Sequence, residues 1–244
     1  MEFIGLLFQE VFYRPFLNLL IWLYNVLPGG DFGVAIVVLT LLIKLVFYPL
    51  NAKSIKAQKI LQELAPQIKE IQEKHKKDKQ RQAQETMAFY KQNKISPFAG
   101  MLPLLIQLPI LFALFKIITN VFNDGALAML YPFVGAPSVI NHVSLGIINL
   151  TATNNIVLGV IAGVLTFWQI KMIQPPKGVP QKTQGKPDFQ SVMQKQMLFM
   201  MPLMTAFFST KFAAGLALYW IFTTAGMIVQ QYIVYKSPPK NLKS

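Results

Sequence analysis

The stretch GVAIVVLTLLIKLVFYPL, residues 33–50, carries one charge, Lys44, in a run that is otherwise apolar apart from Thr40 and Tyr48. A run of this length and composition predicts a transmembrane helix. An isolated cation at membrane depth costs roughly 2.5–3.5 kcal/mol on insertion scales, so such residues usually face protein or water rather than lipid. Lys44 therefore either extends its ammonium group to the membrane surface or occupies a hydrated site inside the protein.

The whole chain shares this apolar character. Of its 244 residues, 53% are hydrophobic and 14% are charged, which is too apolar for an ordinary soluble domain. Each membrane crossing needs about 20 residues. Five apolar runs are candidate spans, at about 33–50, 99–118, 155–173, 197–209 and 213–235. The sequence predicts an all-α membrane protein with five transmembrane helices.

The positive charge lies between these apolar runs. The net charge is +13; residues 51–98 contain eleven Lys and Arg and residues 171–196 contain five Lys, whereas residues 119–154 contain neither. Lys and Arg are enriched in the cytoplasmic loops of membrane proteins. This pattern predicts an N-terminus outside and a C-terminus inside, and it gives no reason to expect direct sequence-specific nucleic-acid binding.

Residues 1–30 are predicted to form an interfacial amphipathic helix on the outer surface of the membrane, with Trp22 and Tyr24 at headgroup depth. Polar residues recur there every three or four positions and leave a stripe on one side of a helix. They are Glu2, Gln9, Glu10, Tyr13, Arg14, Asn18 and Asn25. A sixth span is the alternative, which would move the N-terminus inside without improving the charge pattern.

The other predicted segments follow from hydropathy and charge. The first span occupies residues 31–50, and residues 51–98 form a cytosolic helical hairpin whose apolar positions alternate by three and four. Residues 99–235 hold the other four spans, with a flexible cytosolic loop at 174–196 that is rich in Pro, Gly and Lys. Residues 236–244 form a basic cytosolic tail.

The chain offers little for catalysis. It has no cysteine and two histidines, His75 and His142, which the predicted topology places on opposite sides of the membrane. All ten acidic residues lie outside the five runs, so no carboxylate pair is available there for acid–base chemistry. We therefore expect a protein that is not an enzyme and that uses no cofactor and no metal.

Neutral polar residues accompany Lys44 in the apolar runs. Thr40 lies one turn before it on the same helical face, and Gln107, Gln169 and Trp220 come from three other runs. Each has an ordinary alternative role in interhelical hydrogen bonding, worth about 0.6 kcal/mol in membranes. Together with Lys44 they predict a polar patch contributed by several helices, as a water-filled groove within a bilayer requires.

The depth of Lys44 limits how far such a groove must reach. Lys44 lies six residues before Leu50, or about 9 Å from the predicted cytoplasmic end of its helix at 1.5 Å per residue. A cavity that opens to the cytoplasm and extends about halfway across the membrane is therefore sufficient.

Three segments, in the same order, resemble the YidC/Oxa-type membrane protein insertase family. GVAIVVLTLLIKLVFYPLNAKS (33–54) is similar to the family's first core span, in which a basic residue follows a threonine by four and precedes Pro-Leu. SPFAGMLPLLIQLPILFALF (96–115) resembles its proline-flanked second span, and FAAGLALYWIFTTAGMIVQQ (212–231) resembles its last span. The likeness is to short bacterial members without a large outer domain.

The resemblance implies an ATP-independent insertase and membrane chaperone of the bacterial cytoplasmic (inner) membrane. Five helices would enclose a groove that is open to the cytoplasm and lipid but closed outside. Its cation would be Lys44, and its groove-facing positions would be Thr40, Gln107, Gln169 and Trp220. The implied partners are nascent membrane proteins and the lipid bilayer, with the ribosome and the Sec translocon as further candidates.

Some features of the chain remain open. The family usually has arginine where Lys44 stands, so the charge is kept but the bidentate fork is lost, and it usually has asparagine in place of Thr224. An adaptable surface for apolar substrate segments, or plain helix packing, would account for Met197, Met200, Met201 and Met204. The rival functions are a small transporter or channel, and a structural assembly subunit without a conduit.

Overall fold

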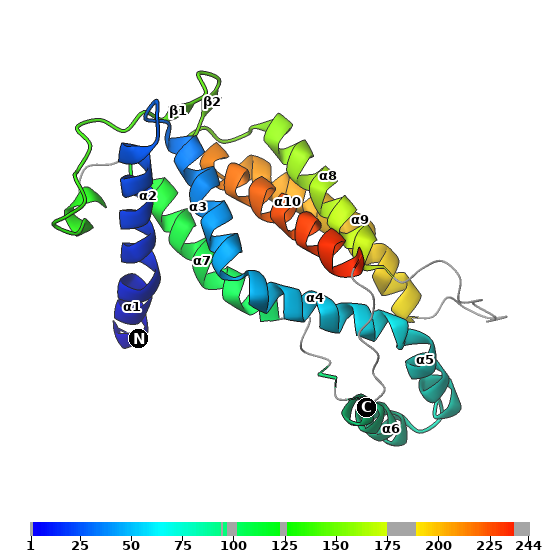
Figure 1. Ribbon diagram of the computed structural model, residues 1–244. Helices are drawn as coiled ribbons and strands as arrows, with labels where there is room; N and C mark the ends of the chain where they lie inside the picture. The colour runs from blue at the N-terminus through cyan, green and yellow to red at the C-terminus, as the bar shows by residue number, and fades with distance from the viewer. Residues whose placement is uncertain (1, 94, 97–101, 123–125, 175–188, 237–244) are drawn as a thin grey trace.

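The computed structural model describes residues 2–93, 95–96, 102–122, 126–174 and 189–236. It is mostly helical (Figure 1), with one two-stranded antiparallel sheet of β1 (Val143–Ser144) and β2 (Ile148–Asn149). Five helices run side by side as a bundle: α3 (Phe32–Val46), α7 (Leu102–Asn120), α8 (Ile156–Ile173), α9 (Phe189–Lys211) and α10 (Ala214–Lys236). We call the end where α3 begins the Asp31 end, and the opposite end the hairpin end.

Two of these helices, α8 and α10, are each long and apolar enough to cross a membrane. The bent pair of α3 and α4 (Tyr48–Glu63) would make a third crossing if it is counted as one span, and Leu105–Asn120 is a shorter apolar helix. This result for the described residues supports a helical membrane protein. The five-span topology remains a prediction.

The first predicted span ends earlier than Leu50. Helix α3 stops at Val46, and α4 leaves it at an angle of 66°. Pro49 lies in the first turn of α4, where its missing N–H costs nothing, but where its ring would clash with the turn before it if α3 continued straight. Lys44 is therefore two residues from the end of α3, rather than six, and the 9 Å depth is wrong for this helix.

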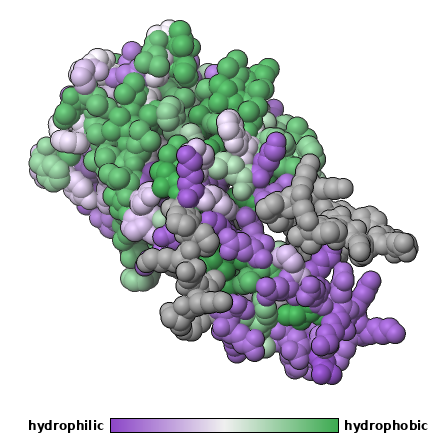
Figure 2. Space-filling view, turned by 45° about the vertical axis from the view of Figure 1, so that its right-hand side comes forward, coloured by the Kyte–Doolittle hydropathy of each residue, from purple (hydrophilic) through white to green (hydrophobic). Residues whose placement is uncertain are grey.

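Helix α4 runs across the hairpin end of the bundle, and α5 (Ala65–Lys74) and α6 (Lys79–Gln92) extend from it as two packed arms (Figure 1). The helix is interrupted at Leu64, between α4 and α5 and just before Pro66. Asp78 caps α6 by accepting a hydrogen bond from the Arg81 backbone N–H. The surface of these arms is hydrophilic, whereas the bundle surface is largely apolar (Figure 2).

Helices α8 and α9 pack at very short range. A Cβ on Gly163 would lie 2.9 Å from the Ala206 Cβ and 3.1 Å from the Pro202 carbonyl oxygen, and a Cβ on Gly159 would lie 2.9 Å from the Ala206 carbonyl oxygen. Small residues four positions apart allow helix backbones to approach in this way. Helix α9 begins at Phe189, so the predicted loop 174–196 ends earlier than expected; its residues 175–188 lie outside the described part of the chain.

The N-terminal segment is a nearly continuous helix that lies beside α3 and α7, with α2 ending at the Asp31 end (Figure 1). It consists of α1 (Glu2–Phe8), the π-helical turn η1 (Gln9–Tyr13) and α2 (Arg14–Val26). Its apolar side contributes Leu17, Leu20 and Ile21 to a core shared with α3, α7 and α10.

Polar side chains of this helix form hydrogen bonds with the loop that joins α7 to α8. Asn18 accepts a hydrogen bond from the Tyr131 backbone N–H (2.6 Å) and donates to the Met129 carbonyl oxygen. Asn25 donates to the carbonyl oxygen of Gly135, while the Tyr24 hydroxyl donates to that of Val139 and accepts from the Asn141 N–H. The Tyr24 side chain is buried under the loop that joins α7 to α8, and its headgroup depth stays a prediction.

A second clamp holds the same loop to the start of α3. The Asp31 carboxylate accepts hydrogen bonds from the Val34 N–H (3.0 Å), the Ser144 hydroxyl (2.6 Å) and the Leu145 N–H (2.6 Å). Gly33 makes room for this contact, because a Cβ there would lie 2.6 Å from the Ser144 Cβ. Asp31 thus caps α3 and fixes the β1–β2 hairpin over the Asp31 end.

Candidate functional site

Lys44 lies inside the bundle between α3 and α10. Its side chain is 8% exposed, and its methylene groups lie along Gly226, where a Cβ would be 3.5 Å from the Lys44 Cγ and 3.8 Å from its Cε. Helices α3 and α10 start at the same end of the bundle and run in the same direction (Figure 1). The absence of a side chain at Gly226 leaves the long lysine stem a place between them.

No described acidic residue neutralises Lys44. Among the residues that the structure describes, the one ion pair joins Arg14 to Glu10 at 3.3 Å, on the N-terminal helix. The same part of the chain contains no group of three or more His, Cys, Asp or Glu placed to hold a metal ion. Lys44 is therefore a buried cationic side chain without a carboxylate partner in the described part of the chain.

The polar residues predicted around Lys44 have different surroundings. Thr40 is buried and donates its hydroxyl proton to the Ile36 carbonyl oxygen within α3 (2.7 Å). Gln107 of α7 donates to the Tyr219 hydroxyl of α10, and thereby connects two helices of the bundle. Thr40 belongs to α3, and the hydrogen-bond partner of Gln107 lies on α10, which packs against α3.

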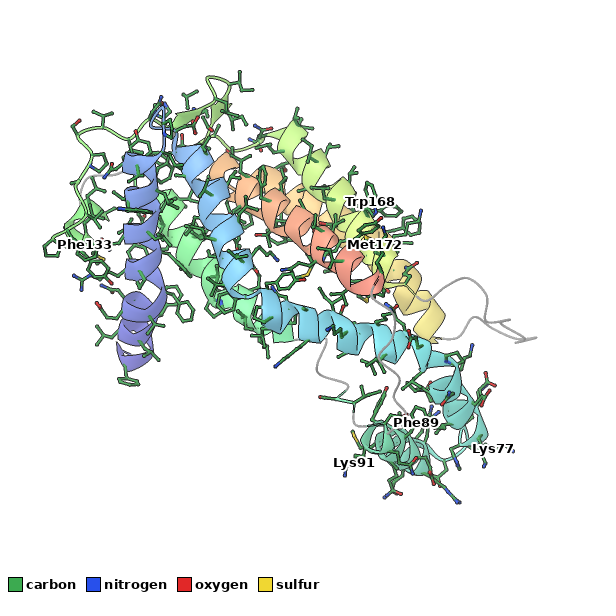
Figure 3. The ribbon with its side chains drawn as sticks, viewed as in Figure 1. Lys77, Phe89, Lys91, Phe133, Trp168 and Met172 are labelled. Carbon is green, nitrogen blue, oxygen red and sulfur yellow. The ribbon has the colours of Figure 1, made fainter. Side chains whose placement is uncertain are left out.

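Two other predicted positions are not shown to reach Lys44. Gln169 is half-buried on α8, whose main packing partners are α9 and α10. Its neighbour Trp168 projects outward from α8 (Figure 3). Trp220 is half-buried on α10, and Thr224 on the same helix is buried.

The predicted methionine surface is on the outside of the bundle. Its four side chains lie on α9, and each is between 44% and 48% exposed: Met197, Met200, Met201 and Met204. Exposed apolar residues of the same helix, Phe199, Leu203 and Phe207, surround them. This face can contact lipid chains or another apolar helix.

Further polar residues, which the sequence pattern assigned to the hairpin or left unassigned, are buried at the hairpin end. Asn51 and Ser54 of α4 and Gln230 and Gln231 of α10 are all at most 7% exposed. Helices α4 and α10 pack against each other, and the side-chain amide oxygens of Gln230 and Gln231 accept no hydrogen bond. Asn51 belongs to α4, which leaves α3 at 66°, so helical spacing from Lys44 does not identify this layer.

Helix α4 is also bonded to the ends of the helices above it. Lys59 donates to the Tyr235 carbonyl oxygen at 3.2 Å and lies over the Tyr235 ring. Gln62 donates to the Tyr235 hydroxyl at 3.1 Å and to the Ile173 carbonyl oxygen. These contacts connect α4 to the last turns of α8 and α10, so α4 covers the hairpin end close to the buried polar layer.

Sequence comparisons find relatives over most of the chain. Residues 22–241 match the model of the family described as 60Kd inner membrane protein. A protein of Syntrophus aciditrophicus named membrane protein insertase YidC is 37% identical over 91% of this chain, but the chain spans only 36% of that relative's length. A protein of the same name from Fusobacterium nucleatum is 31% identical over 85% of this chain and 87% of its own length.

A solved structure has the same fold. It is the crystal structure described as an active YidC insertase with its first transmembrane domain resolved. The match covers 95% of this chain and 47% of the chain in that structure, with a TM-score of 0.59 and 24% sequence identity. Together with the family match over residues 22–241 and the apolar helices, these likenesses fix the class of the protein. The chain belongs to the 60Kd inner membrane protein family, the YidC/Oxa-type family, and is a multi-pass protein of the bacterial inner membrane.

Proposed function

We propose that this protein is a membrane protein insertase and chaperone that receives nascent membrane proteins from the cytoplasm and releases their hydrophobic helices into lipid. The observation that carries this proposal is Lys44, a buried cation with no described carboxylate beside it, in a chain whose relatives are named insertases. The proposal includes five spans, an N-terminus outside and a C-terminus inside, as the positive-inside pattern predicts.

Lys44 acts by attracting acidic or polar segments of the substrate. At a separation of 4 Å, a lysine and a carboxylate attract each other by about 1 kcal/mol in water and about 4 kcal/mol at an effective dielectric constant of 20. An interaction in this range holds a hydrated tail without trapping it. The hydrophobic helix of the substrate meanwhile moves into lipid, where burial of its apolar surface drives the step.

Access to Lys44 requires a movement at the hairpin end. Lys44 is two residues before the end of α3, and α4, which follows, is held to α8 and α10 through Lys59 and Gln62. We propose that α4 swings about its junction with α3 at Phe47, where the 66° bend already interrupts the helix. This movement would expose the layer formed by Lys44, Asn51, Gln230 and Gln231 to the cytoplasm.

The test is insertion by the purified protein in liposomes, measured by protease protection of a single-span substrate with an acidic N-terminal tail. Lys44→Arg should retain insertion, Lys44→Met should reduce it about tenfold or more, and Lys44→Glu should reduce it further because like charges repel. Lys211→Met is the matched control: Lys211 is exposed at the other end of the bundle and should be dispensable.

A substrate whose acidic tail residues are changed to Asn and Gln separates charge attraction from a general defect. Lys44→Met should insert this neutral substrate nearly as well as the unmodified protein does. Equal insertion of the acidic substrate by the unmodified protein and Lys44→Met would show that Lys44 is not the substrate-attracting group. Steady ion current through the purified protein in bilayers would instead favour a channel.

A further inference from the structure

Lys116 is a second cation within an apolar helix, and the insertase proposal gives it no role. It lies on α7 four residues before Asn120, which ends the helix, and its side chain is exposed. The Phe32 and Phe122 rings meet edge to face at 5.3 Å, which places this end of α7 beside the start of α3. Lys116 is thus at the Asp31 end, far from the basic hairpin, whose Lys77 and Lys91 project from the opposite end (Figure 3).

The surroundings of Lys116 come from two different elements. Its ammonium lies 5.1 Å from the centre of the Tyr13 ring, and Tyr13 is a buried residue of η1. Helix α7 and η1 pack against each other, so Lys116 occupies a corner between them. Lys211 differs, because it lies over Phe207 of its own helix, one turn earlier.

Exposed apolar side chains extend along α7 from this corner. They form a stripe that leads up to Lys116, with residues three or four positions apart: Leu105, Leu108, Phe112 and Phe115. The stripe from Leu105 to Lys116 is about 16 Å long at 1.5 Å per residue, which is close to half of the ~30 Å hydrocarbon core of a bilayer.

Lys116 has no acidic partner among the described residues, whose one ion pair joins Arg14 and Glu10. An aromatic ring face attracts a cation but carries no net negative charge. An anion that binds Lys116 would lie at the end of an apolar stripe that is about one leaflet long. A phospholipid phosphate has this position relative to its acyl chains.

We propose that Lys116, held beside the Tyr13 ring, binds the phosphate of an anionic phospholipid in the leaflet at the Asp31 end, and that the α7 stripe contacts its acyl chains. The bound lipid fills the corner between α7 and η1. This site is separate from Lys44, and its presence or absence leaves the insertase proposal untouched.

The test is native mass spectrometry of the full-length protein with phosphatidylglycerol or phosphatidylcholine of identical acyl chains. One lysine near an anionic lipid surface contributes enough to change affinity about fivefold. Lys116→Gln should weaken the tightest phosphatidylglycerol binding by this factor and leave phosphatidylcholine binding unchanged, whereas Lys116→Arg should retain it. Lys211→Gln should have no such effect, because the ring beside Lys211 belongs to its own helix.

Two results would overturn the site. One is unchanged phosphatidylglycerol affinity in Lys116→Gln, and the other is an equal loss in Lys211→Gln, which would indicate general attraction to helix-end lysines. The control for folding is the unfolding temperature in lipid-free detergent. If Lys116→Gln and the unmodified protein unfold at the same temperature, a loss of lipid binding is not caused by a loss of folding. Inorganic phosphate should not displace the lipid at millimolar concentration, since the acyl chains supply part of the binding, and displacement would contradict the proposed site.

Discussion

The hydrogen bonds of Asp31 predict how the Asp31 end is held closed. Its carboxylate caps α3 through the Val34 N–H and binds the β1–β2 hairpin through the Ser144 hydroxyl and the Leu145 N–H. Asp31→Ala would remove all three contacts. Asp31→Asn would keep one oxygen able to accept from Val34 and Ser144, but it would lose the negative charge and one acceptor oxygen.

The size of each effect follows from the bonds that are lost. Removal of an N-cap costs about 1 kcal/mol, and hydrogen bonds to a charged group contribute about 1.5–3 kcal/mol each. Asp31 is only partly buried, so solvent replaces some of this loss. We expect Asp31→Ala to lower the free energy of unfolding by about 2–4 kcal/mol and Asp31→Asn by about 1–2 kcal/mol.

Asp31 also makes this stability depend on pH. Burial raises the pKa of its carboxyl, but the hydrogen bonds from Ser144, Leu145 and Val34 outweigh burial, and the pKa is lowered overall. A pKa that is lower in the folded than in the unfolded protein gives stability that is complete above the unfolded value of about 3.9. This stability is lost as the pH falls through the folded value.

The assay is chemical unfolding in mixed micelles at pH 7 and at steps down to pH 3, for the unmodified protein, both Asp31 variants and Ser144→Ala. The excess stability of the unmodified protein over Asp31→Asn should shrink below pH 4, and Ser144→Ala should lose about 1 kcal/mol. An Asp31→Ala variant within 0.5 kcal/mol of the unmodified protein at pH 7, or an unchanged difference between the unmodified protein and Asp31→Asn at pH 3, would refute the reasoning.

Two further predictions concern helix packing. Gly163→Val should lower the free energy of unfolding by about 1–3 kcal/mol by overpacking, because a Cβ would meet Ala206 and Pro202. The control is Gly5→Ala, where a Cβ meets nothing within 4 Å; equal unfolding midpoints for the two variants would contradict the close packing of α8 and α9. Gln62→Leu combined with Tyr235→Phe should increase amide hydrogen exchange in α4 several-fold, because both hydrogen bonds that Gln62 forms with α8 and α10 are lost. Exchange in α3 should not change, and unchanged exchange in α4 would show that these bonds do not hold it.

The sequence predicted helices best where their boundaries are local. The runs 155–173 and 213–235 agree closely with α8 and α10, because hydropathy and the Asn155 cap act within a few residues. The first span was overextended because hydropathy continues through Phe47 and Tyr48, whereas Pro49 changes the direction of the backbone. The bend after α3 therefore ends the first helix two residues after Lys44.

Contacts between distant residues were beyond the sequence. The polar stripe near the N-terminus identified one face of a helix, but it gave no sign that Asn18 and Asn25 bond the loop at residues 126–141. Similarly, the pattern identifies Gln107 and Lys44 as unusual, but only packing brings Gln107 to Tyr219 and Lys44 to Gly226. Hydropathy describes the polarity of a side chain and does not identify the group that it will contact in the folded protein.

The way α2 holds the loop between α7 and α8 has a consequence for sequence variation. Asn18, Tyr24 and Asn25 bind carbonyl oxygens and N–H groups, which every residue except proline offers in the same form. Gly135 and the Val139 side chain are exposed, and only the carbonyl oxygens of these residues take part in these bonds. The shape of the loop is therefore encoded largely in α2, and its outward-facing positions are free to diverge between relatives or to be randomised in a library while the backbone keeps its path.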